Sequence, residues 1–301
     1  MEVDIKLTKK RTFSEKFFHA LFMTAALFAV VCVIAIIILI FTRGSRPFMP
    51  GNVYGTYNFF DFLTGTFWRP AFGEFGVGYM IFGSLFATLG AMLLGVPIGI
   101  LTAVFISEIA PKPIAKIMQP TVELLAAIPS VLYGVFGFAV IVPMLNNISP
   151  NPTGHSLLAV VLVLTIMVLP SIVAISVTSL RAVPKYYKEG SLALGASRIQ
   201  TIFKVLIPSA KSGILTAVVL GVGRAIGETM AVILVAGNPE SGIPTSIFDQ
   251  VRLLTTNIVL EQGYAAELQE QMLFATVIVL FIFILAINLT LAKIRKKAVE
   301  Q

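Results

Sequence analysis

Charged residues are scarce in this sequence, and their scarcity excludes a water-soluble fold. Of its 301 residues, 57% are hydrophobic and only 12% are charged, and the mean hydropathy is +0.92. A soluble globular chain carries about 25% charged residues, so too few are present here to cover a surface that faces water. The composition therefore predicts an integral membrane protein.

Residues with catalytic or metal-binding chemistry are also nearly absent. Cys32 is the single cysteine, so no intrachain disulfide can form, and His19 and His155 lie far apart without a partnering cluster. No Gly-x-x-x-x-Gly-Lys-Ser/Thr phosphate loop occurs, so we do not expect the chain to bind or hydrolyse ATP. The sequence predicts no enzyme active site, no metal site and no cofactor.

Long apolar stretches are what the sequence does contain. A helix of about 20 apolar residues, at about 1.5 Å per residue, crosses a hydrocarbon core of about 30 Å. Six stretches have about this length: 17–41, 82–107, 120–145, 156–178, 211–237 and 271–292. We therefore expect an all-α membrane protein with about six transmembrane helices.

The basic residues are distributed unequally between the two sides of this arrangement. Of the 22 lysines and arginines, 17 fall in the two termini and in the loops after the second and fourth stretches, whereas the opposite loops hold only Arg43, Arg46, Arg69 and Arg252. Basic loops stay in the cytoplasm, so both termini are expected there. The net charge of +7 thus reflects topology, and no nucleic-acid partner is expected.

This topology divides the chain into five parts. The first apolar stretch is too long for the core of a signal peptide, so we interpret it as an uncleaved anchor. The expected parts are a basic cytoplasmic N-terminus (1–16), the first transmembrane anchor helix (17–41), an extracytoplasmic loop (42–81), a core of five helices (82–292) and a basic cytoplasmic tail (293–301). The loop is rich in aromatic residues, which indicates either a belt at the membrane interface or a docking surface for an external partner.

Two pairs of glycines are placed for close helix packing. Gly95 and Gly99 are four residues apart, as are Gly223 and Gly227. Each pair presents two glycines on one helix face, where another backbone can approach closely. We expect tight packing at both positions, and a hinge that takes part in gating is the alternative.

A conspicuous motif lies in the loop after the fourth apolar stretch, at about residues 184–208. Pro184 suits the start of a helix, Gly195 suits the left-handed residue that ends one, and Ser197 with Gln200 forms a capping-box pattern for a second helix. One apolar stripe along that second helix is expected from Ile199, Ile202, Phe203 and Leu206. Two short helices joined at a glycine, with an apolar stripe, favour docking against another protein.

The spacing in this loop resembles the "EAA" loop of ABC-type importer permeases. Glu189-Gly190-Ser191 is followed after three residues by Gly195, and after nine more by Val205-Leu206-Ile207-Pro208. The family pattern is Glu-Ala-Ala, three residues, Gly, nine residues and Ile-x-Leu-Pro, so the substituted positions carry other small or apolar residues. The resemblance implies that Glu189, Gly195 and Pro208 belong to a loop that docks into a cytoplasmic ATPase.

Two further segments narrow the resemblance. Residues 123–134 (Glu-Leu-Leu-Ala-Ala-Ile-Pro-Ser-Val-Leu-Tyr-Gly) and 223–230 (Gly-Arg-Ala-Ile-Gly-Glu-Thr-Met) look like phosphate-specific transport (Pst) permeases, particularly PstC subunits. This implies a phosphate importer of the cell (inner) membrane, with a second permease (PstA-like), a cytoplasmic ATPase dimer (PstB-like) and an extracytoplasmic phosphate-binding protein (PstS-like). A permease for another oxyanion, such as molybdate or sulfate, and a stand-alone secondary transporter are the alternatives.

Ionisable residues within the apolar stretches are the candidates for the translocation pathway. Arg224 lies about 18 Å along the fifth stretch, and Glu228 follows at i+4, on the same face of a continuous helix. An intramembrane charge is expensive and indicates function, although a purely structural ion pair is the alternative. Thr229 offers a hydroxyl to an anion, and Glu123 is a weaker candidate near the cytoplasmic interface.

Overall fold

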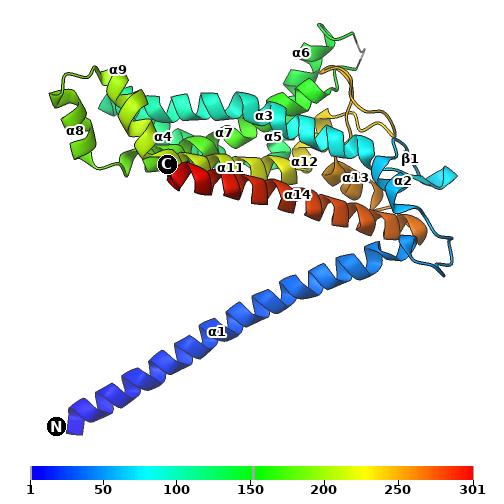
Figure 1. Cartoon of the computed structure of the whole chain (residues 1–301), viewed down its shortest axis with the longest axis horizontal. Helices are drawn as coiled ribbons and strands as arrows, with labels where there is room; N and C mark the ends of the chain where they lie inside the picture. Colours follow the sequence, from blue (N-terminus) through cyan, green and yellow to red (C-terminus); the bar gives the residue numbers. More distant parts are fainter. Residues whose placement is uncertain (1, 151–152, 301) are drawn as a thin grey trace.

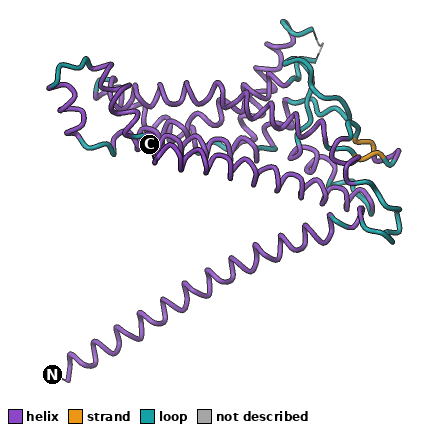
Figure 2. Tube along the Cα trace, viewed as in Figure 1, coloured by secondary structure: helices purple, strands orange, loops and turns teal. Residues whose placement is uncertain are grey.

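Helices make up most of the computed structural model, which describes residues 2–150 and 153–300 and the side chains of 15–150 and 153–296. Figures 1 and 2 show an elongated helical bundle with loops gathered at its two ends and one long helix standing away from it. The helices are α1 (Glu2–Gly44), α2 (Phe59–Thr64), α3 (Gly78–Val104), α4 (Lys112–Ala126), α5 (Ser130–Phe136), α6 (Val142–Asn146), α7 (Leu157–Arg181), α8 (Lys185–Ala193), α9 (Arg198–Thr201), α10 (Ile207–Ser209), α11 (Lys211–Gly227), α12 (Met230–Val235), α13 (Leu254–Glu261) and α14 (Leu268–Glu300). Short 3-10 or π turns link several of them: η1 (Arg46–Phe48), η2 (Pro70–Phe72), η3 (Phe105–Ile109), η4 (Gly137–Ile141) and η5 (Ile202–Leu206).

Between four and six of these units are candidate membrane spans. Four helical segments are long and apolar enough to cross a membrane, and six spans result if each of two bent helix pairs counts as one. In one pair, α4 and the helix that starts at Ser130 meet at 97°; in the other, the helix ending at Ser209 and α11 meet at 70°. The predicted fold class is confirmed, but the stretch 120–145, expected as one straight helix, is sharply bent at 127–129.

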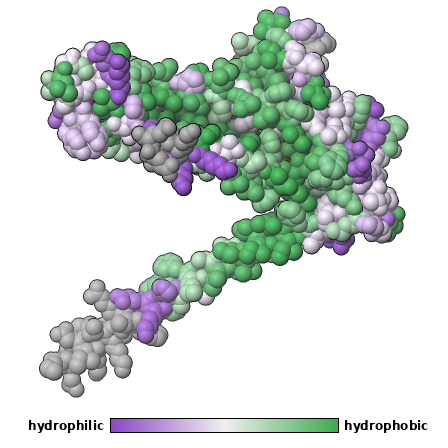
Figure 3. Space-filling view, in the orientation of Figure 1, coloured by the Kyte–Doolittle hydropathy of each residue, from purple (hydrophilic) through white to green (hydrophobic). Residues whose placement is uncertain are grey.

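Helix α1 leaves the bundle as an arm and touches it only near its end at Gly44. There the ring centroids of Phe41 and Phe281 are 6.3 Å apart, and a Cβ added to Gly44 would lie 2.7 Å from the Phe274 backbone. The most apolar 18-residue window of the arm has none of its residues buried. Figure 3 shows this apolar surface exposed along the arm. The apolar stretch of α1 therefore depends on lipid or on another chain for its cover.

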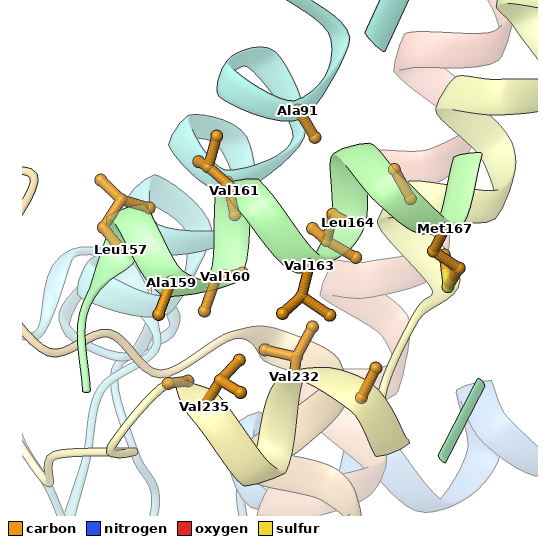
Figure 4. Packing of buried hydrophobic residues seen from close by; sticks show 14 of the residues in the cluster. Ala91, Leu157, Ala159, Val160, Val161, Val163, Leu164, Met167, Val232 and Val235 are labelled. Carbon is orange, nitrogen blue, oxygen red and sulfur yellow. The ribbon is translucent and has the colours of Figure 1, made fainter. Parts of the chain in front are cut away.

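Helix α7 forms the centre of the bundle, between α3 on one side and α11 and α12 on the other. Its valines are buried, as are Leu157, Leu164 and Leu180, and Figure 4 shows part of this set packing between Ala91 of α3 and Val232 of α12. A Cβ added to Gly99 of α3 would lie 2.7 Å from Ile172 of α7. The close packing predicted for Gly95 and Gly99 is confirmed.

The aromatic loop between α1 and α3 folds into a small subdomain. Trp68 on β1 (Trp68–Arg69) is fully buried, and β1 pairs antiparallel with β2 (Glu74–Phe75). The Trp68 backbone N–H also donates to the carbonyl of Glu240, 2.8 Å away, which joins this loop to the segment before α13. Phe60 and Phe72 are exposed, at 73% and 79%. The aromatics thus divide between a core and a surface patch.

The loops assemble at two opposite ends of the bundle. The loop end carries residues 45–77 and 236–253, whereas the coupling end carries α8 and α9 together with the turn between α3 and α4. Both termini lie toward the coupling end in Figure 1. This grouping is the one that the distribution of basic residues predicts, and a cytoplasmic location for the coupling end stays a prediction.

Candidate functional site

The continuous helix expected over 211–237 is broken at Glu228 and Thr229. Helix α11 ends at Gly227, Glu228 adopts an extended backbone (φ −72°, ψ 130°), and α12 begins at Met230. The buried Glu228 carboxylate (Oε1) accepts a hydrogen bond of 3.0 Å from the Ala231 N–H. The side chain thus satisfies a backbone donor at the start of α12, where no preceding helical carbonyl is available.

Arg224 lies one turn before this break and contacts a different helix. Its Nη1 donates to Ser171 Oγ of α7 at 2.9 Å, and the side chain is half-buried. Both Arg224 and Glu228 are described in full, and no ion pair joins them. Arg224 and Glu228 were expected on one face of a continuous helix, and this expectation is wrong, because the helix ends at Gly227. The structural ion pair, which was the alternative interpretation, is not formed in this structure. Most of the guanidinium donors remain available.

A second interruption, between α4 and α5, packs beside the first. The Tyr133 hydroxyl donates to the carbonyl of Leu125 at 2.6 Å, which bridges the bend. Helix α5 packs on α12 so closely that a Cβ added to Gly134 would lie 2.7 Å from the Ala231 Cα. Broken helices at membrane depth are tolerated where protein or a water-filled cavity surrounds them.

The surface next to Arg224 is open in this chain. Gly223 and Gly227 are exposed, and nothing lies within 4 Å of a Cβ added to either residue. Thr229 is half-buried, and its hydroxyl donates to the Gly227 carbonyl at 3.4 Å. Unlike Gly95 and Gly99, the Gly223–Gly227 pair has no packing partner among the residues that the structure describes.

Glu123 stands apart from the other three pathway candidates. It is exposed on α4, where its Oε1 accepts from Gln119 Nε2 at 3.2 Å. Gln119 Oε1 in turn accepts from Arg181 Nη1 at 2.6 Å, at the end of α7 next to the coupling end. Arg224, Glu228 and Thr229 thus lie at or within one turn of the same helix break, each with a different hydrogen-bond partner, whereas Glu123 belongs to a separate polar chain that links α4 to α7.

Residues 184–208, the coupling segment, adopt the two-helix arrangement that the sequence predicts. Helix α8 precedes Gly195, whose φ of +84° is the left-handed conformation expected at a helix end. The capping box is present: Ser197 Oγ accepts from the Gln200 N–H at 3.2 Å, and Gln200 Oε1 accepts from the Ser197 N–H at 2.9 Å. Glu189 and Pro208 are exposed on this segment.

The apolar stripe predicted on the second helix divides between two environments. Ile202 and Leu206 are buried, at 2% and 3% exposure, in a cluster with residues from α3 and α7. Ile199 and Phe203 are exposed, at 63% and 50%. Half of the stripe therefore anchors the coupling segment to the bundle, and the other half remains available to a partner.

Sequence reasoning identified neither Ser171, which contacts Arg224, nor Tyr133, which bridges the neighbouring bend. Ser171 is one hydroxyl in an apolar stretch, and nothing local in the sequence connects it to Arg224, which lies 53 residues away. Tyr133 carried a stronger signal, because it falls within the segment 123–134 that resembles Pst permeases. The site can attract an anion, because its arginine makes few hydrogen bonds and hydroxyl groups lie in the same region. Among the residues of the site there is no nucleophile paired with a general base.

Comparison with known proteins identifies relatives among transport permeases. Residues 95–298 match the family described as the binding-protein-dependent transport system inner membrane component. A probable ABC transporter permease protein of Bacillus subtilis, YqgH, is 41% identical over 271 residues, which cover 87% of this chain and 86% of the relative. The phosphate transport system permease protein PstC of Mesorhizobium japonicum is 32% identical over 289 residues, which cover 89% and 86%.

The fold itself is shared with a solved transporter. A chain of the bacterial alginate ABC transporter, in complex with its alginate pentasaccharide-bound periplasmic protein, superposes with a TM-score of 0.64 at 17% identity, covering 93% of this chain and 92% of that one. The all-helical fold expected of an ABC importer permease is thereby confirmed. The protein is a multi-pass membrane component and is not itself an enzyme. The chain belongs to the family of binding-protein-dependent transport system inner membrane components, the permease subunits of ABC importers.

Proposed function

We propose that this chain is a permease subunit of an ATP-driven importer of inorganic phosphate and forms the translocation pathway together with a second permease. Arg224 is the observation that carries the proposal. It lies in a candidate span, and one of its N–H groups donates to Ser171. The neighbouring surface at Gly223 and Gly227 is not covered by any part of the described chain. A charge in such a place is unfavourable against lipid, which favours an aqueous or protein-lined pathway on that side.

The chemistry of Arg224 suits a tetrahedral oxyanion. A guanidinium offers parallel N–H donors to two oxygens of a phosphate and stays charged at any physiological pH. Release requires that the bound anion is not held too tightly. A single arginine, with the neutral hydroxyls of Ser171 and Thr229 in the same region, would attract the phosphate. Without further cations, it would not bind the phosphate too tightly for release. In this proposal Glu228 shapes the pathway by capping α12.

The proposed partners follow from the two ends of the molecule. Tyr186, Leu194 and Phe203 are exposed on the coupling segment, and this apolar surface supports docking of a cytoplasmic ATPase dimer (PstB-like) around Glu189, Gly195 and Pro208. The loop end would receive an extracytoplasmic phosphate-binding protein (PstS-like). The open Gly223–Gly227 surface would face a second permease (PstA-like), and lipid of the inner membrane would surround the remainder, with both termini cytoplasmic.

Another oxyanion is the alternative substrate, because sulfate and molybdate present the same tetrahedral oxygens to an arginine. Relatives at 32% identity that are called phosphate transport permeases favour phosphate. A stand-alone secondary transporter disagrees with the family to which the chain belongs.

Uptake by a reconstituted importer decides between these substrates. The chain would be placed in liposomes with its second permease, its ATPase and its binding protein, and labelled phosphate would be added outside with ATP inside. We expect ATP-dependent accumulation of phosphate that a large excess of sulfate or molybdate does not reduce. Accumulation of labelled sulfate or molybdate instead of phosphate would show that the substrate is wrong.

A further inference from the structure

One ion pair connects the first coupling helix to the end of a membrane span. Lys188 Nζ of α8 lies 2.5 Å from Glu108 Oε2 in the π turn η3, which follows α3, and the two residues are 80 positions apart. The Glu108 side chain is only 10% exposed, and the Lys188 side chain is 34% exposed. A carboxylate this well buried needs its partner, because an unpaired buried charge is strongly unfavourable.

The rest of α8 stands off from the spans. A cavity of about 530 Å³ lies between α8 and the ends of α3 and α7, and Glu108, Leu180, Val183, Lys188, Glu189 and Leu192 help to line it. In the part of the chain whose side chains the structure describes, the Lys188–Glu108 contact is the one ion pair that α8 makes with the end of α3. The other polar side-chain contact of α8 lies within the coupling segment, where the hydroxyls of Ser191 and Thr201 are 3.0 Å apart. The ion pair therefore bridges a gap that apolar packing does not fill.

The second half of the coupling segment is attached in another way. Ile202 and Leu206 of the π turn η5 are buried against Val104, Ile106 and Val173, so apolar packing fixes this half. Two π turns, η3 and η5, thus meet in one buried cluster at the coupling end. π turns are locally irregular and are frequent at functional positions. The coupling segment consequently has one apolar anchor, through η5, and one polar anchor, through Lys188.

We propose that the Lys188–Glu108 pair is a positioning contact, which carries displacement of α8 to the end of α3 and, through the short connection at Pro111, to α4. Helix α4 ends at the bend before α5, and α5 packs on α12 beside Arg224. An ion pair across a gap resists both approach and separation of the two elements, so it transmits movement in both directions. The proposal rests on the role proposed above for the coupling segment.

The test uses the complete transporter with four variants of this chain. Glu108→Gln and Lys188→Gln each remove the pair, and the exchange Glu108→Lys with Lys188→Glu rebuilds it in reverse. Lys293→Gln is the matched control, because Lys293 is an exposed lysine at the same end of the molecule, on α14. Amide hydrogen exchange of residues 105–126 is compared with and without a non-hydrolysable ATP analogue, and phosphate uptake per ATP hydrolysed is measured on the same preparations.

We expect nucleotide to change the exchange of residues 105–126 in the parent and in Lys293→Gln. Both single variants should lose that response and take up about tenfold less phosphate per ATP hydrolysed, and the exchange variant should recover both. A parental response in either single variant would overturn the proposal, as would an exchange variant no better than the singles. If a single variant fails to assemble, the exchange variant still tests the proposal. It rebuilds the ion pair with the charges reversed, so recovery of the nucleotide response and of uptake in this variant can be attributed to the contact itself.

The exchange measurement does not depend on the transported anion. A parent complex that shows the nucleotide response but accumulates no phosphate contradicts the proposed substrate and supports the positioning contact. A parent complex that accumulates phosphate without any response at 105–126 contradicts the positioning contact and leaves the proposed function supported.

Discussion

Arg224 shows how a single side chain depends on its surroundings at membrane depth. A lone arginine at the centre of a span costs about 2.5–3.5 kcal/mol on insertion scales. The hydrogen bond to Ser171 Oγ offsets only part of that cost, because a bond to a charged group contributes about 1.5–3 kcal/mol. Glu228 contributes no ion pair, since its carboxylate caps Ala231. A residue kept in so costly a state is explained better by transport than by packing.

Replacing Arg224 tests this interpretation. Arg224→Gln should abolish phosphate uptake while assembly persists, because glutamine is polar and can still donate hydrogen bonds but lacks the positive charge and the forked donors of arginine. Complex assembly is measured by co-purification of the subunits, and uptake by reconstitution. Since Glu228 is not paired with Arg224, adding Glu228→Gln should neither stabilise the complex nor restore uptake. Parental uptake in the double variant would show that the two residues form a structural pair after all.

Glu228 has its own expected signature. Glu228→Gln keeps an oxygen that can accept from the Ala231 N–H, so the start of α12 should stay capped. Glu228→Ala loses this acceptor and should lower the free energy of unfolding by about 1 kcal/mol. Thermal unfolding of the purified complex distinguishes the two variants. Equal melting temperatures would contradict the capping role.

At the scale of elements, short-range patterns were predictable and interruptions were not. Gly195 and the Ser197–Gln200 capping box were predicted because neighbouring residues alone determine them. The bend at 127–129 and the break at Glu228 were missed, because hydropathy over a long window does not register one or two residues outside a helix. Proline 129 signalled the bend, but proline also occurs within transmembrane helices. Ser171 joins the site only through tertiary packing.

Gly195 offers a sharp test of the coupling segment. Its φ of +84° is costly for any residue with a Cβ, and most of all for a β-branched one. Gly195→Val should therefore disturb the turn, weaken ATPase association and lower uptake while membrane insertion stays normal. Gly195→Asn is the matched control, because asparagine adopts the left-handed conformation more readily than other residues with a Cβ. Equal ATPase retention by both variants in a pull-down would contradict a role for the turn.

At the scale of the whole molecule, residues that the charge pattern of the sequence places on the same side of the membrane also form ion pairs with each other. The Lys188–Glu108 pair joins two loops at the coupling end, and at the loop end Arg43 lies 3.9 Å from Glu270. The positive-inside rule assigned both of these groupings from the sequence. The same rule predicts that the coupling end faces the cytoplasm, because the basic loops meet there.

Reporter fusions test the orientation directly. Fusions near Arg69 and Glu261 should be active on the outer side of the membrane, and fusions near Lys188 and Lys296 on the inner side. A phosphatase reporter that is active only outside and a fluorescent reporter that folds only inside provide complementary signals. An outer-side signal near Lys188 would invert the topology and remove the coupling segment from any cytoplasmic ATPase.

The detached arm α1 has a consequence for how the protein is made. Its best window has the highest mean hydropathy of the four uninterrupted spans, 3.2, and none of that window is buried. A segment so apolar can partition from the translocon into lipid by itself as soon as it is synthesised. Helix α11 carries Arg224 and is stabilised by Ser171 of α7, which is synthesised earlier. Helix α1, which needs no neighbour, is therefore synthesised before the rest of the bundle, and α11 is synthesised after α7, which supplies the partner of Arg224.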